Sequence, residues 1–408
     1  MTASGGRIKH AGPLLNSGTG ILSAEPEKVE SQGAAHAAFV AIAQARALRP
    51  AWESLCAELL EENPFYTPGA LIPALEAFAD PGVQLACVWS GDALIALLPV
   101  AKRRFYARLP VAYWANWTHP HCYYGAPLIR RGAEAEAYQG LFTLLCEGED
   151  ARAFLRLSRI ERDGPAMRAG VAAAHAGRRL AYDAGAISRA ALRAGASAEA
   201  TLVVHVRKKK RKELARLRKR LEELGAVRLR ELSPGDDLSQ WTEDFLTLED
   251  KSWKGRRRTS LKSNEADASW FRETLRDMAA AQALHFLRLD LDDKPVAMLA
   301  TLICSGAAYT LKICHDPDYA KFSPGVMIEI EAMRALLGRS DFRFADSCAA
   351  PDHQMINGLW RARRVVTGLN DSGRSVAARG ALGLARLLEG ARARLPQKLG
   401  ERTGDERV

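Results

Sequence analysis

Hydrophobic residues recur along the chain with two spacings, one typical of helices and the other typical of strands. Residues 45–61, 238–250 and 268–281 repeat apolar positions roughly every three or four residues, which predicts amphipathic helices. Residues 83–89 and 93–102 are rich in strand-forming residues and flank the turn Ser90-Gly91-Asp92, which predicts a hairpin. The pattern is therefore that of an α/β protein.

The hairpin pattern occurs a second time. Residues 284–291 and 295–304 flank Asp292-Asp293-Lys294, and the dipeptides Ile95-Ala96 and Val296-Ala297 fall at the same offset after their turns. Similarity at such a long period suggests a duplication.

A strand over 308–315, a helix over 325–338 and a strand over 342–348 follow the second hairpin. A crossover of this length predicts parallel strands, and ligands of such units collect beyond the carboxyl ends of the strands. Simple alternation along the first strand separates two sets of side chains. One face receives Tyr309, Leu311, Ile313 and His315, and the other receives Thr310, Lys312 and Cys314.

These patterns predict two α/β halves, each a mixed sheet flanked by helices, over residues 37–195 and 196–372. Residues 1–36 lack periodicity and are expected to form a disordered lead-in. Residues 373–408 form an Arg- and Ala-rich tail, with a helix expected over 376–394.

Composition narrows the class of protein. No apolar run approaches the ~20 residues needed to span a bilayer, and the first 35 residues lack the order of a signal peptide. We expect a cytoplasmic protein that can be peripheral to the inner membrane. The seven cysteines have no paired spacing, which argues against a disulfide framework or structural zinc.

The formal charge of +10 favours an anionic partner and is partly local. Ten of the fourteen residues from Arg207 to Arg220 are Lys or Arg. A helix over 207–224 would place Leu214, Leu217, Leu221 and Leu224 on one stripe and cations on its other faces. A helix that only packs through this stripe needs fewer cations. Phosphate groups of a partner would explain the excess, so tRNA, a phospholipid or a phosphorylated sugar is a candidate partner.

The start of the crossover helix is a candidate anion site. Ser323 suits the N-cap, Pro324 the first helical position and Gly325 the second. The N–H groups of Gly325, Val326 and Met327 would then be available to a negatively charged group, and Lys321 could add a cation. A well-capped helix without a ligand is the alternative.

Several motifs together resemble a bacterial GNAT-related family found in cellulose and exopolysaccharide loci (CelD-like), which is similar to the FemABX peptidyltransferases. The resemblance is carried by Glu249-Asp250-Lys251-Ser252-Trp253-Lys254-Gly255, by Lys312-Ile313-Cys314-His315-Asp316-Pro317 and by Tyr319 with Ser323-Pro324-Gly325. It extends over about residues 37–370 and includes Tyr123-Tyr124-Gly125-Ala126-Pro127-Leu128 in the first half.

The resemblance implies tandem GNAT-like halves and transfer of an acyl or aminoacyl group to an amine or hydroxyl. Acyl-CoA, with acetyl-CoA first, is the implied donor, and a sugar or lipid-linked saccharide is the implied acceptor. The chain departs from the family's glycine-rich pyrophosphate loop, because it has only Lys321-Phe322-Ser323-Pro324-Gly325 there. It also replaces the family's acidic, glycine-rich segment and Tyr-Lys with the segment from Asp346 to His353.

Acyl transfer needs a group that takes a proton from the acceptor and groups that hold the carbonyl. Asp346 and His353 are the candidate bases, with a turn or cap role as the alternative for each. Cys348 could be a nucleophile or a packing residue. Lys312 is unusual in mid-strand and could reach a phosphate or carboxylate, or extend to solvent.

The remaining candidates would bind substrate. Trp253-Lys254-Gly255 and the three arginines after it could close over a donor or a sugar, or form a plain surface loop. The other candidates belong to the family-like strand end or to the segment after Asp346: His315, Tyr319, Asn357 and Trp360. His119-Pro120-His121-Cys122 lacks a second ligand pair, so no metal is expected.

Three functions remain open from the sequence. The first is an N-acyltransferase acting on an envelope or exopolysaccharide precursor. The second is an aminoacyl-tRNA-dependent, FemABX-like transferase, suggested by the helix over 207–224. The third is a catalytically silent binding or scaffold protein, suggested by the missing glycine-rich loop.

Overall fold

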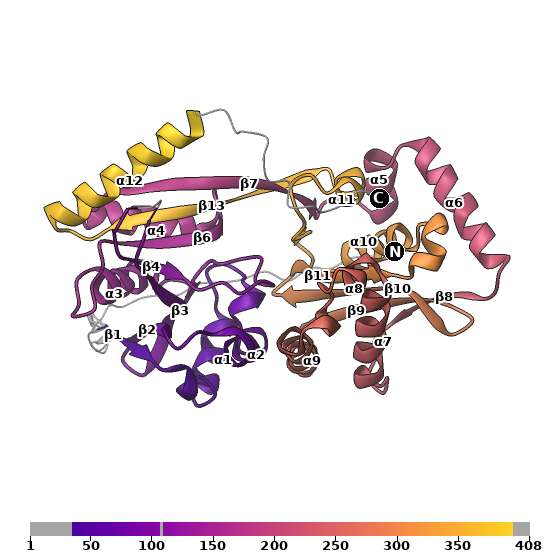
Figure 1. The fold of residues 1–408 in the computed structure, drawn as a ribbon, viewed down its shortest axis with the longest axis horizontal. Helices are drawn as coiled ribbons and strands as arrows, with labels where there is room; N and C mark the ends of the chain where they lie inside the picture. Colours follow the sequence, from indigo (N-terminus) through magenta and orange to yellow (C-terminus); the bar gives the residue numbers. More distant parts are fainter. Residues whose placement is uncertain (1–34, 107–108, 395–408) are drawn as a thin grey trace, which may run out of the picture. The chain divides into compact units, whose positions relative to one another are not determined.

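The structure is a computed structural model that describes residues 35–106 and 109–394, and its central feature is a long mixed β-sheet (Figure 1). The strands follow the spatial order β1-β2-β3-β4-β6-β13-β7-β12-β11-β10-β9-β8, and β5 pairs with β3. Most of the expected lead-in and the end of the tail, beyond residue 394, lie outside the described residues.

Each half contributes the same ten elements in the same order. The first half runs β1 (His36–Val40), α1 (Arg49–Ala57), α2 (Pro68–Phe78), β2 (Val83–Ser90), β3 (Ala93–Arg103), β4 (Tyr113–Asn116), α3 (Glu134–Cys146), β6 (Phe154–Glu161), α4 (Pro165–Ala176) and β7 (Ala181–Arg193). The second half runs β8 (Val227–Glu231), α7 (Leu238–Lys251), α9 (Glu265–Ala280), β9 (Leu284–Leu291), β10 (Lys294–Cys304), β11 (Ala307–His315), α10 (Pro324–Leu337), β12 (Phe344–Asp346), α11 (Gln354–Leu359) and β13 (Ala362–Ser372). This repeated order supports the duplication predicted from the hairpins.

The remaining elements are insertions or connections. The short ones are η1 (Ile42–Gln44), η2 (Pro64–Tyr66), β5 (Leu128–Ile129), α8 (Trp253–Arg256), η3 (Leu261–Ser263) and η4 (Pro317–Phe322). The longer ones are α5 (Ala198–His205) and α6 (Lys208–Glu222), which join the halves, and α12 (Val376–Arg394), which follows β13.

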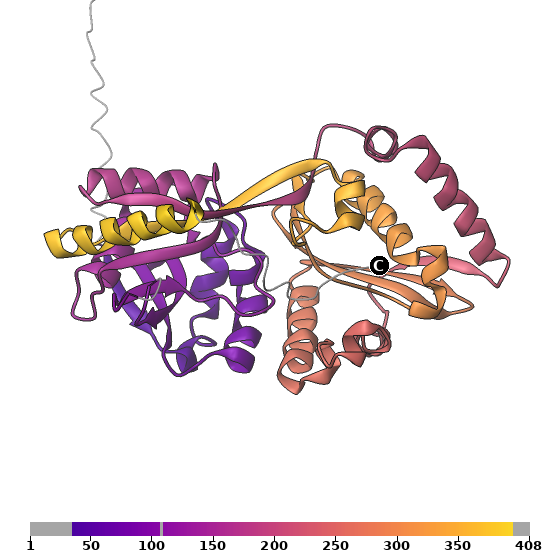
Figure 2. The same cartoon turned by 45° about the horizontal axis from the view of Figure 1, so that its top comes forward.

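The last strands of the two halves are exchanged. β13 lies between β6 and β7 of the first half, while β7 pairs with β12 of the second half. Figures 1 and 2 show β7 and β13 running side by side across the middle of the sheet. Each half therefore needs the final strand of the other to continue its sheet.

Most predicted elements are confirmed. Both hairpins form, β11 and β12 are parallel as predicted for the crossover unit, and the helix expected over 376–394 is α12. The helix predicted over 45–61 is shorter, because α1 begins at Arg49 with Pro50 in its first turn. A proline disrupts a helix interior but suits the first turn.

The predicted faces of β11 are wrong beyond Leu311. A β-bulge there pairs Thr310 with Thr301 and Lys312 with Ala300, which leaves Leu311 as an extra residue. An extra residue reverses the alternation of side chains that follow it. Cys314 accordingly packs in the same hydrophobic cluster as Tyr309 and Leu311, whereas Ile313 packs on the other side.

The basic helix is α6, and its apolar stripe is shorter than predicted. Leu214, Leu217 and Leu221 are buried, but Leu224 is 53% exposed. The helix ends at Glu222, so Leu224 no longer follows the helical stripe.

The largest hydrophobic cluster draws residues from both halves, including Trp52 and Leu97 from the first and Phe245 and Trp270 from the second. Helices α2 and α9, which are equivalent in the repeat, also contact each other where Gly69 meets Met278. Within the described ranges, no helix combines the length and apolar character needed to cross a membrane.

Candidate functional site

The carboxyl half of β11 has one open edge. β12 pairs only with Ala307–Tyr309, so the strand from Thr310 to His315 continues past its parallel neighbour. On its other edge this stretch is bonded to β10. Within the described chain no strand covers the open edge, so its outward N–H and C=O groups can receive a ligand.

Helix α10 begins beside the end of this strand. Ser323 is its N-cap and Pro324 its first residue, as predicted, but Ser323 has a left-handed backbone (φ 57°) and its side chain makes no capping bond. The N–H groups of Val326 and Met327 donate to the carbonyl of Ser323, at 3.1 and 3.2 Å. The prediction of three available amides is therefore wrong for these two.

Gly325 is buried against the His315 side chain. A Cβ built on Gly325 would lie 3.3 Å from His315 Nδ1. Lys321 is exposed, and its ammonium lies 5.1 Å from the centre of the Phe322 ring. Tyr319 and Phe322 pack with Leu217 and Leu221 of α6.

Titratable side chains from both halves meet beside the open strand. His121 comes from the loop between β4 and β5, Asp267 from α9, Lys312 from β11, Lys254 from α8 and Glu249 from α7. We call these five residues the junction cluster. Lys312 and Lys254 were predicted site residues, whereas His121 had been considered only as a metal ligand.

A hydrogen-bonded pair forms the centre of the junction cluster. His121 Nε2 lies 2.7 Å from Asp267 Oδ1, and the two side chains are 12% and 22% exposed. Burial of the imidazole, helped by nearby Lys312 and Lys254, lowers the pKa of His121 to about 3. Burial raises the pKa of Asp267, and Lys312 opposes this change. His121 is thus a neutral imidazole at neutral pH, oriented by a carboxylate.

Lys254 is fixed by a buried partner. Its Nζ lies 2.9 Å from Glu249 Oε1, and Glu249 is 2% exposed. Burial opposes the charged ammonium, but Glu249 outweighs it and raises the pKa of Lys254. Glu249 also accepts from the backbone N–H of Leu261 at 2.8 Å, which ties α7 to the loop after α8.

Aromatic rings wall one side of the cluster. Trp270 stacks on His121 with ring centres 4.3 Å apart, and Phe78 stacks on His119 at 5.4 Å. His119 is buried, and its Nδ1 has no hydrogen-bond partner among the described residues. Burial lowers the pKa of His119 well below its usual value.

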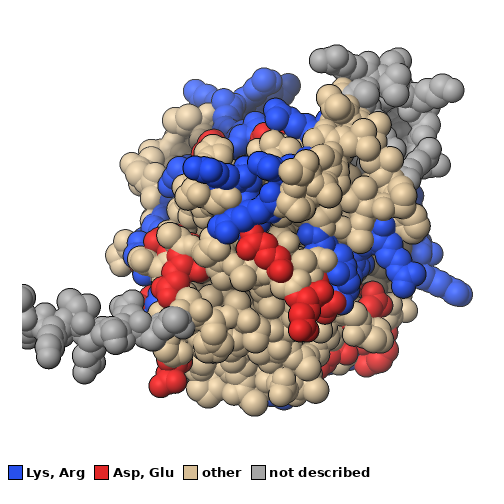
Figure 3. All heavy atoms as spheres, turned by 90° about the vertical axis from the view of Figure 1, so that its left-hand side faces the viewer, with Lys and Arg blue, Asp and Glu red and all other residues tan. Residues whose placement is uncertain are grey.

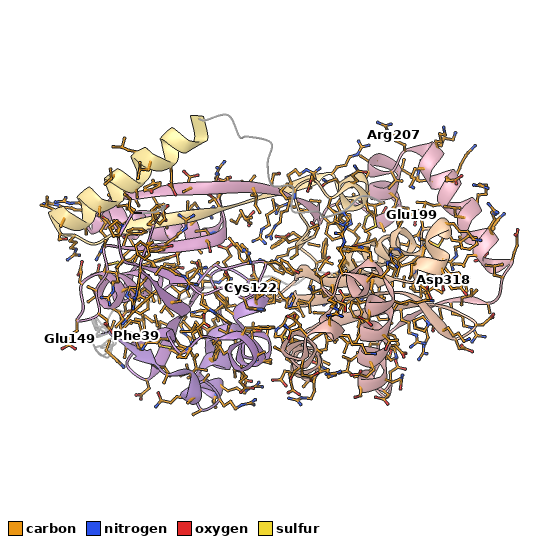
Figure 4. All side chains as sticks on the ribbon, in the orientation of Figure 1. Phe39, Cys122, Glu149, Glu199, Arg207 and Asp318 are labelled. Carbon is orange, nitrogen blue, oxygen red and sulfur yellow. The ribbon has the colours of Figure 1, made fainter. Side chains whose placement is uncertain are left out.

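Asp346 lies in a second, fully buried network. It pairs with Arg189 at 2.6 Å and with Arg364 at 3.1 Å, and accepts from the N–H of Cys348 at 2.8 Å. Arg364 also pairs with Glu161 at 3.0 Å and donates to Tyr309 Oη at 3.0 Å. Arg189 donates to the carbonyl of Tyr123 at 2.8 Å, so this network reaches the segment that carries His121. Figure 4 labels Cys122, which belongs to that segment.

Burial raises the pKa of Cys348 well above its usual value, so its thiol is protonated at neutral pH. A thiol in that state is a weak nucleophile. The backbone of Cys348 is left-handed (φ 54°) and turns the chain sharply after β12.

The remaining predicted residues lie on or next to α11. His353 is the N-cap of α11, and its Nδ1 accepts from the N–H of Ile356 at 3.4 Å. Asn357 donates to the Pro351 carbonyl and accepts from Arg363. Trp360 is buried in a hydrophobic cluster with Ile356 and Leu359. The structure does not bring these three residues into the junction cluster.

The loop around Trp253 is built on a tight turn. Ser252 caps α8 by accepting from the N–H of Lys254, and Arg257 lies over the Trp253 ring at 5.2 Å. A Cβ on Gly255 would collide with the carbonyl of Asp250. Only glycine allows this approach, and the approach fixes Lys254 next to Glu249.

The residues at the start of α10 do not fit the diphosphate of coenzyme A well. Pro324 has no N–H, and the amides of Val326 and Met327 already bond to Ser323. The Gly325 amide, Ser323 Oγ and Lys321 are left for an anion, and a diphosphate usually receives a longer run of backbone N–H groups. Over the described residues, no group of three His, Cys, Asp or Glu side chains has an arrangement suited to a metal ion.

Sequence reasoning missed Asp267 and Glu249 as site residues. Each lies on a helix far from Lys312 in the chain, and no local motif links them. The one indication in the sequence that either residue belongs to the site is that Glu249 begins the Glu249–Gly255 motif.

Part of the chain is similar to a known type of domain. Residues 208–353 match the model of an acetyltransferase (GNAT) domain, and this range contains four of the five junction residues and the open edge of β11. No curated protein sequence matches the chain.

Two solved structures have a similar fold at low sequence identity, and a third is similar to a lower degree. FemX has a TM-score of 0.53 at 9% identity, covering 84% of this chain and 98% of FemX. The C-terminal domain of a candidate lysylphosphatidylglycerol synthetase from Agrobacterium fabrum has a TM-score of 0.50 at 10% identity, covering 84% and 97%. A tandem GNAT protein from the clavulanic acid biosynthesis pathway has a TM-score of 0.39 at 15% identity, covering 84% and 99%. The expected fold class, a mixed α/β protein with GNAT-like halves, is confirmed.

Proposed function

We propose that the protein is an acyltransferase whose acyl donor lies along the open edge of β11 and whose acceptor enters at the junction cluster. The observation that carries this proposal is the open edge of the carboxyl half of β11 beside His121 and Asp267. This part of β11 lies in the range that matches a GNAT domain. The proposed acceptor is an amine or hydroxyl of an envelope or exopolysaccharide precursor, in line with the CelD-like resemblance.

The proposed reaction forms a bond between the acceptor nitrogen or oxygen and the acyl carbon, and breaks the acyl bond to the donor's sulfur or oxygen. Nε2 of His121 is paired with Asp267, so Nδ1 is the nitrogen left to take the acceptor's proton. An outward N–H of β11 can donate to the acyl oxygen as it gains charge. Lys312 and Lys254 favour negative charge in the same place.

The other predicted residues are proposed to support the site without taking part in the transfer. Asp346 orients Arg189 and Arg364, and Arg189 in turn holds the carbonyl of Tyr123. We propose Asp346 as a positioning residue, while His353, Asn357 and Trp360 support α11.

The donor is proposed from two classes. Acyl-CoA is the donor that GNAT domains typically use. An aminoacyl ester of tRNA is the alternative, favoured by the small number of anion-binding groups at the start of α10. With such a donor, the phosphates would bind elsewhere on the protein.

The test is a release assay on the purified full-length chain. Acetyl-CoA and longer acyl-CoA esters are each incubated with a panel of amino sugars, and free thiol and acylated sugar are measured together. Parallel reactions contain radiolabelled aminoacyl-tRNA. Acceptor-dependent release with wild-type protein that falls about 100-fold in His121→Gln supports the proposal.

His175→Gln is the matched control, because His175 lies on α4, away from the junction cluster. It should retain wild-type activity. If no acyl-CoA or aminoacyl-tRNA is bound at millimolar and micromolar concentrations respectively, the transferase proposal fails. A binding or scaffold protein then becomes the better account.

A further inference from the structure

The turn between α5 and α6 combines exposed apolar side chains with an unusual run of cations. Val203 is 55% exposed and Val204 is 66% exposed at the end of α5. Arg207 comes three residues after Val204, and Figure 4 labels it at the outer margin of the second half, where α5 meets α6. Exposed apolar residues are common on protein surfaces, but two adjacent valines beside a run of cations match the composition of segments that lie at a membrane surface.

The cations beside these valines are not neutralised. Six cations, residues 207–212, open α6. Among the described residues, no carboxylate lies within ion-pair distance of five of them, which are Arg207, Lys208, Lys209, Lys210 and Lys212, while Arg211 donates to the Val206 carbonyl. All five are exposed. Farther along α6, by contrast, Arg216 pairs with Glu213 and Arg218 with Glu222. The uncompensated charge is therefore concentrated at the end of α6 that adjoins the valines.

Packing holds α6 with this charge facing outward. Leu217 and Leu221 are buried in a cluster with Phe322 and Met327, which docks α6 on η4 and the start of α10. The outer side carries a hollow lined by Lys208, Lys209, Lys212, Glu213 and Arg216. Because the apolar stripe of α6 is buried inside the protein, the cations on its other faces are available to an external partner.

Many basic side chains of the first half have an acidic partner. On the face in Figure 3, Lys and Arg side chains lie among Asp and Glu side chains. Pairs of the first half such as Arg162 with Asp183 and Arg152 with Asp150 are of this mixed kind. The opening of α6 combines cations that form no ion pair among the described residues with exposed apolar residues beside them.

We propose that the α5–α6 turn binds the surface of a membrane containing anionic lipids. The unpaired cations would bind lipid phosphates, and Val203 and Val204 would enter the boundary between headgroups and acyl chains. Nucleic acid accounts for the cations but offers exposed aliphatic side chains no apolar medium, so the valines favour a lipid surface. The proposal does not depend on transfer activity.

Binding there would hold one end of helix α6 at the membrane. Helix α6 packs on η4, which lies between β11 and α10 in the chain.

Vesicle flotation with the full-length protein tests the proposal. Vesicles of phosphatidylcholine alone are compared with vesicles containing about 30% phosphatidylglycerol, chosen so that anionic lipid attracts each cation measurably. We expect binding only to the anionic vesicles. Lys208→Glu combined with Lys209→Glu should weaken it at least about tenfold, and Val203→Ser combined with Val204→Ser should weaken it several-fold without changing net charge.

Lys262→Glu combined with Lys294→Glu is the matched control, because it changes the net charge equally at exposed sites away from α6. It should retain most of the binding. The same variants are assayed with duplex RNA at equal salt. Vesicle binding that does not need anionic lipid overturns the proposal. So does RNA binding that outcompetes vesicles while the valine variant behaves as wild type.

Discussion

At the scale of single residues, burial rather than residue type decides which side chains can do chemistry here. Cys348 is a reactive residue type, but burial keeps its thiol protonated. His121 is the proposed base, because burial and its neighbours keep the imidazole neutral and Asp267 orients it. Its titration is the most direct test of the site.

The proposed base should remain active at low pH. An ordinary histidine is protonated below about pH 6.5, whereas the pKa of His121 is lowered to about 3. A lowered pKa means that the neutral form persists as the pH falls, so kcat/KM should not drop between pH 8 and pH 5 because of this group. Lys312→Met removes a neighbouring cation, which raises the pKa of His121 and should shift any acid limb to higher pH.

The measurement is a pH profile of kcat/KM for wild type, Lys312→Met and the His175→Gln control. The control should keep the wild-type profile. A wild-type limb near pH 6.5, unchanged by Lys312→Met, would show that another group is the base.

Arg364 is the residue whose loss should cost the most stability. It is 1% exposed and pairs with Asp346 and Glu161, with its guanidinium 4.1 Å from the centre of the Tyr124 ring. Arg364→Met leaves the buried Glu61 carboxylate without its cation and leaves Asp346 with Arg189 alone. Breaking a buried pair costs about 3–5 kcal/mol in comparable proteins. Urea unfolding should show this loss.

The control is Arg162→Met, which removes an exposed pair with Asp183 whose side chains are 45% and 47% exposed. Surface pairs of this kind contribute about 0–1 kcal/mol. Equal effects of the two substitutions would mean that the buried network around Arg364 contributes little to stability.

The sequence could not have indicated the complete site at this scale. Lys312 and Lys254 were identified because they stand in family-like motifs. His121 and Asp267 are separated by well over a hundred residues and belong to different halves. Their meeting depends on how α9 packs against the first half, and local periodicity does not encode that packing.

At the scale of elements, turns and bulges determine where functional side chains point. The strand β11 was predicted correctly in its extent, but a single extra residue at Leu311 changed which face carries Lys312. Hydrophobic alternation cannot reveal a bulge when residues on both faces are largely apolar. The tight turn formed by α8 is more predictable, since its glycine stands in the Trp253-Lys254-Gly255 motif.

Gly255→Ala should therefore damage both stability and the site. The added Cβ collides with the Asp250 carbonyl, so the turn must open and Lys254 must leave Glu249. We expect a loss of about 1–3 kcal/mol, as for other overpacked positions. Gly358→Ala is the matched control, because nothing lies within 4 Å of its Cβ and it sits in α11. In thermal unfolding it should be neutral or slightly stabilising, and a similar loss in both variants would contradict the collision.

At the scale of the whole molecule, the exchanged strands β7 and β13 make the two halves interdependent. The sequence predicted a duplication and a boundary near residue 195, and periodicity is well suited to show such repeats. Pairing between distant strands is not encoded locally, so the exchange could not be predicted. A linear division at 195 would separate β7 from β12 and β13, its two neighbours in the sheet.

Cleavage between the halves should consequently leave them associated. A site-specific protease sequence inserted after Gly195, in the exposed stretch before α5, would cut the chain without removing a strand. The two pieces should co-elute in gel filtration and separate only in denaturant, because β13 of one piece completes the sheet of the other. Either piece expressed alone should aggregate, since an uncovered sheet edge pairs with other chains. If the cut pieces separate in native buffer and each remains monomeric, the halves fold independently and the exchanged strands do not hold them together.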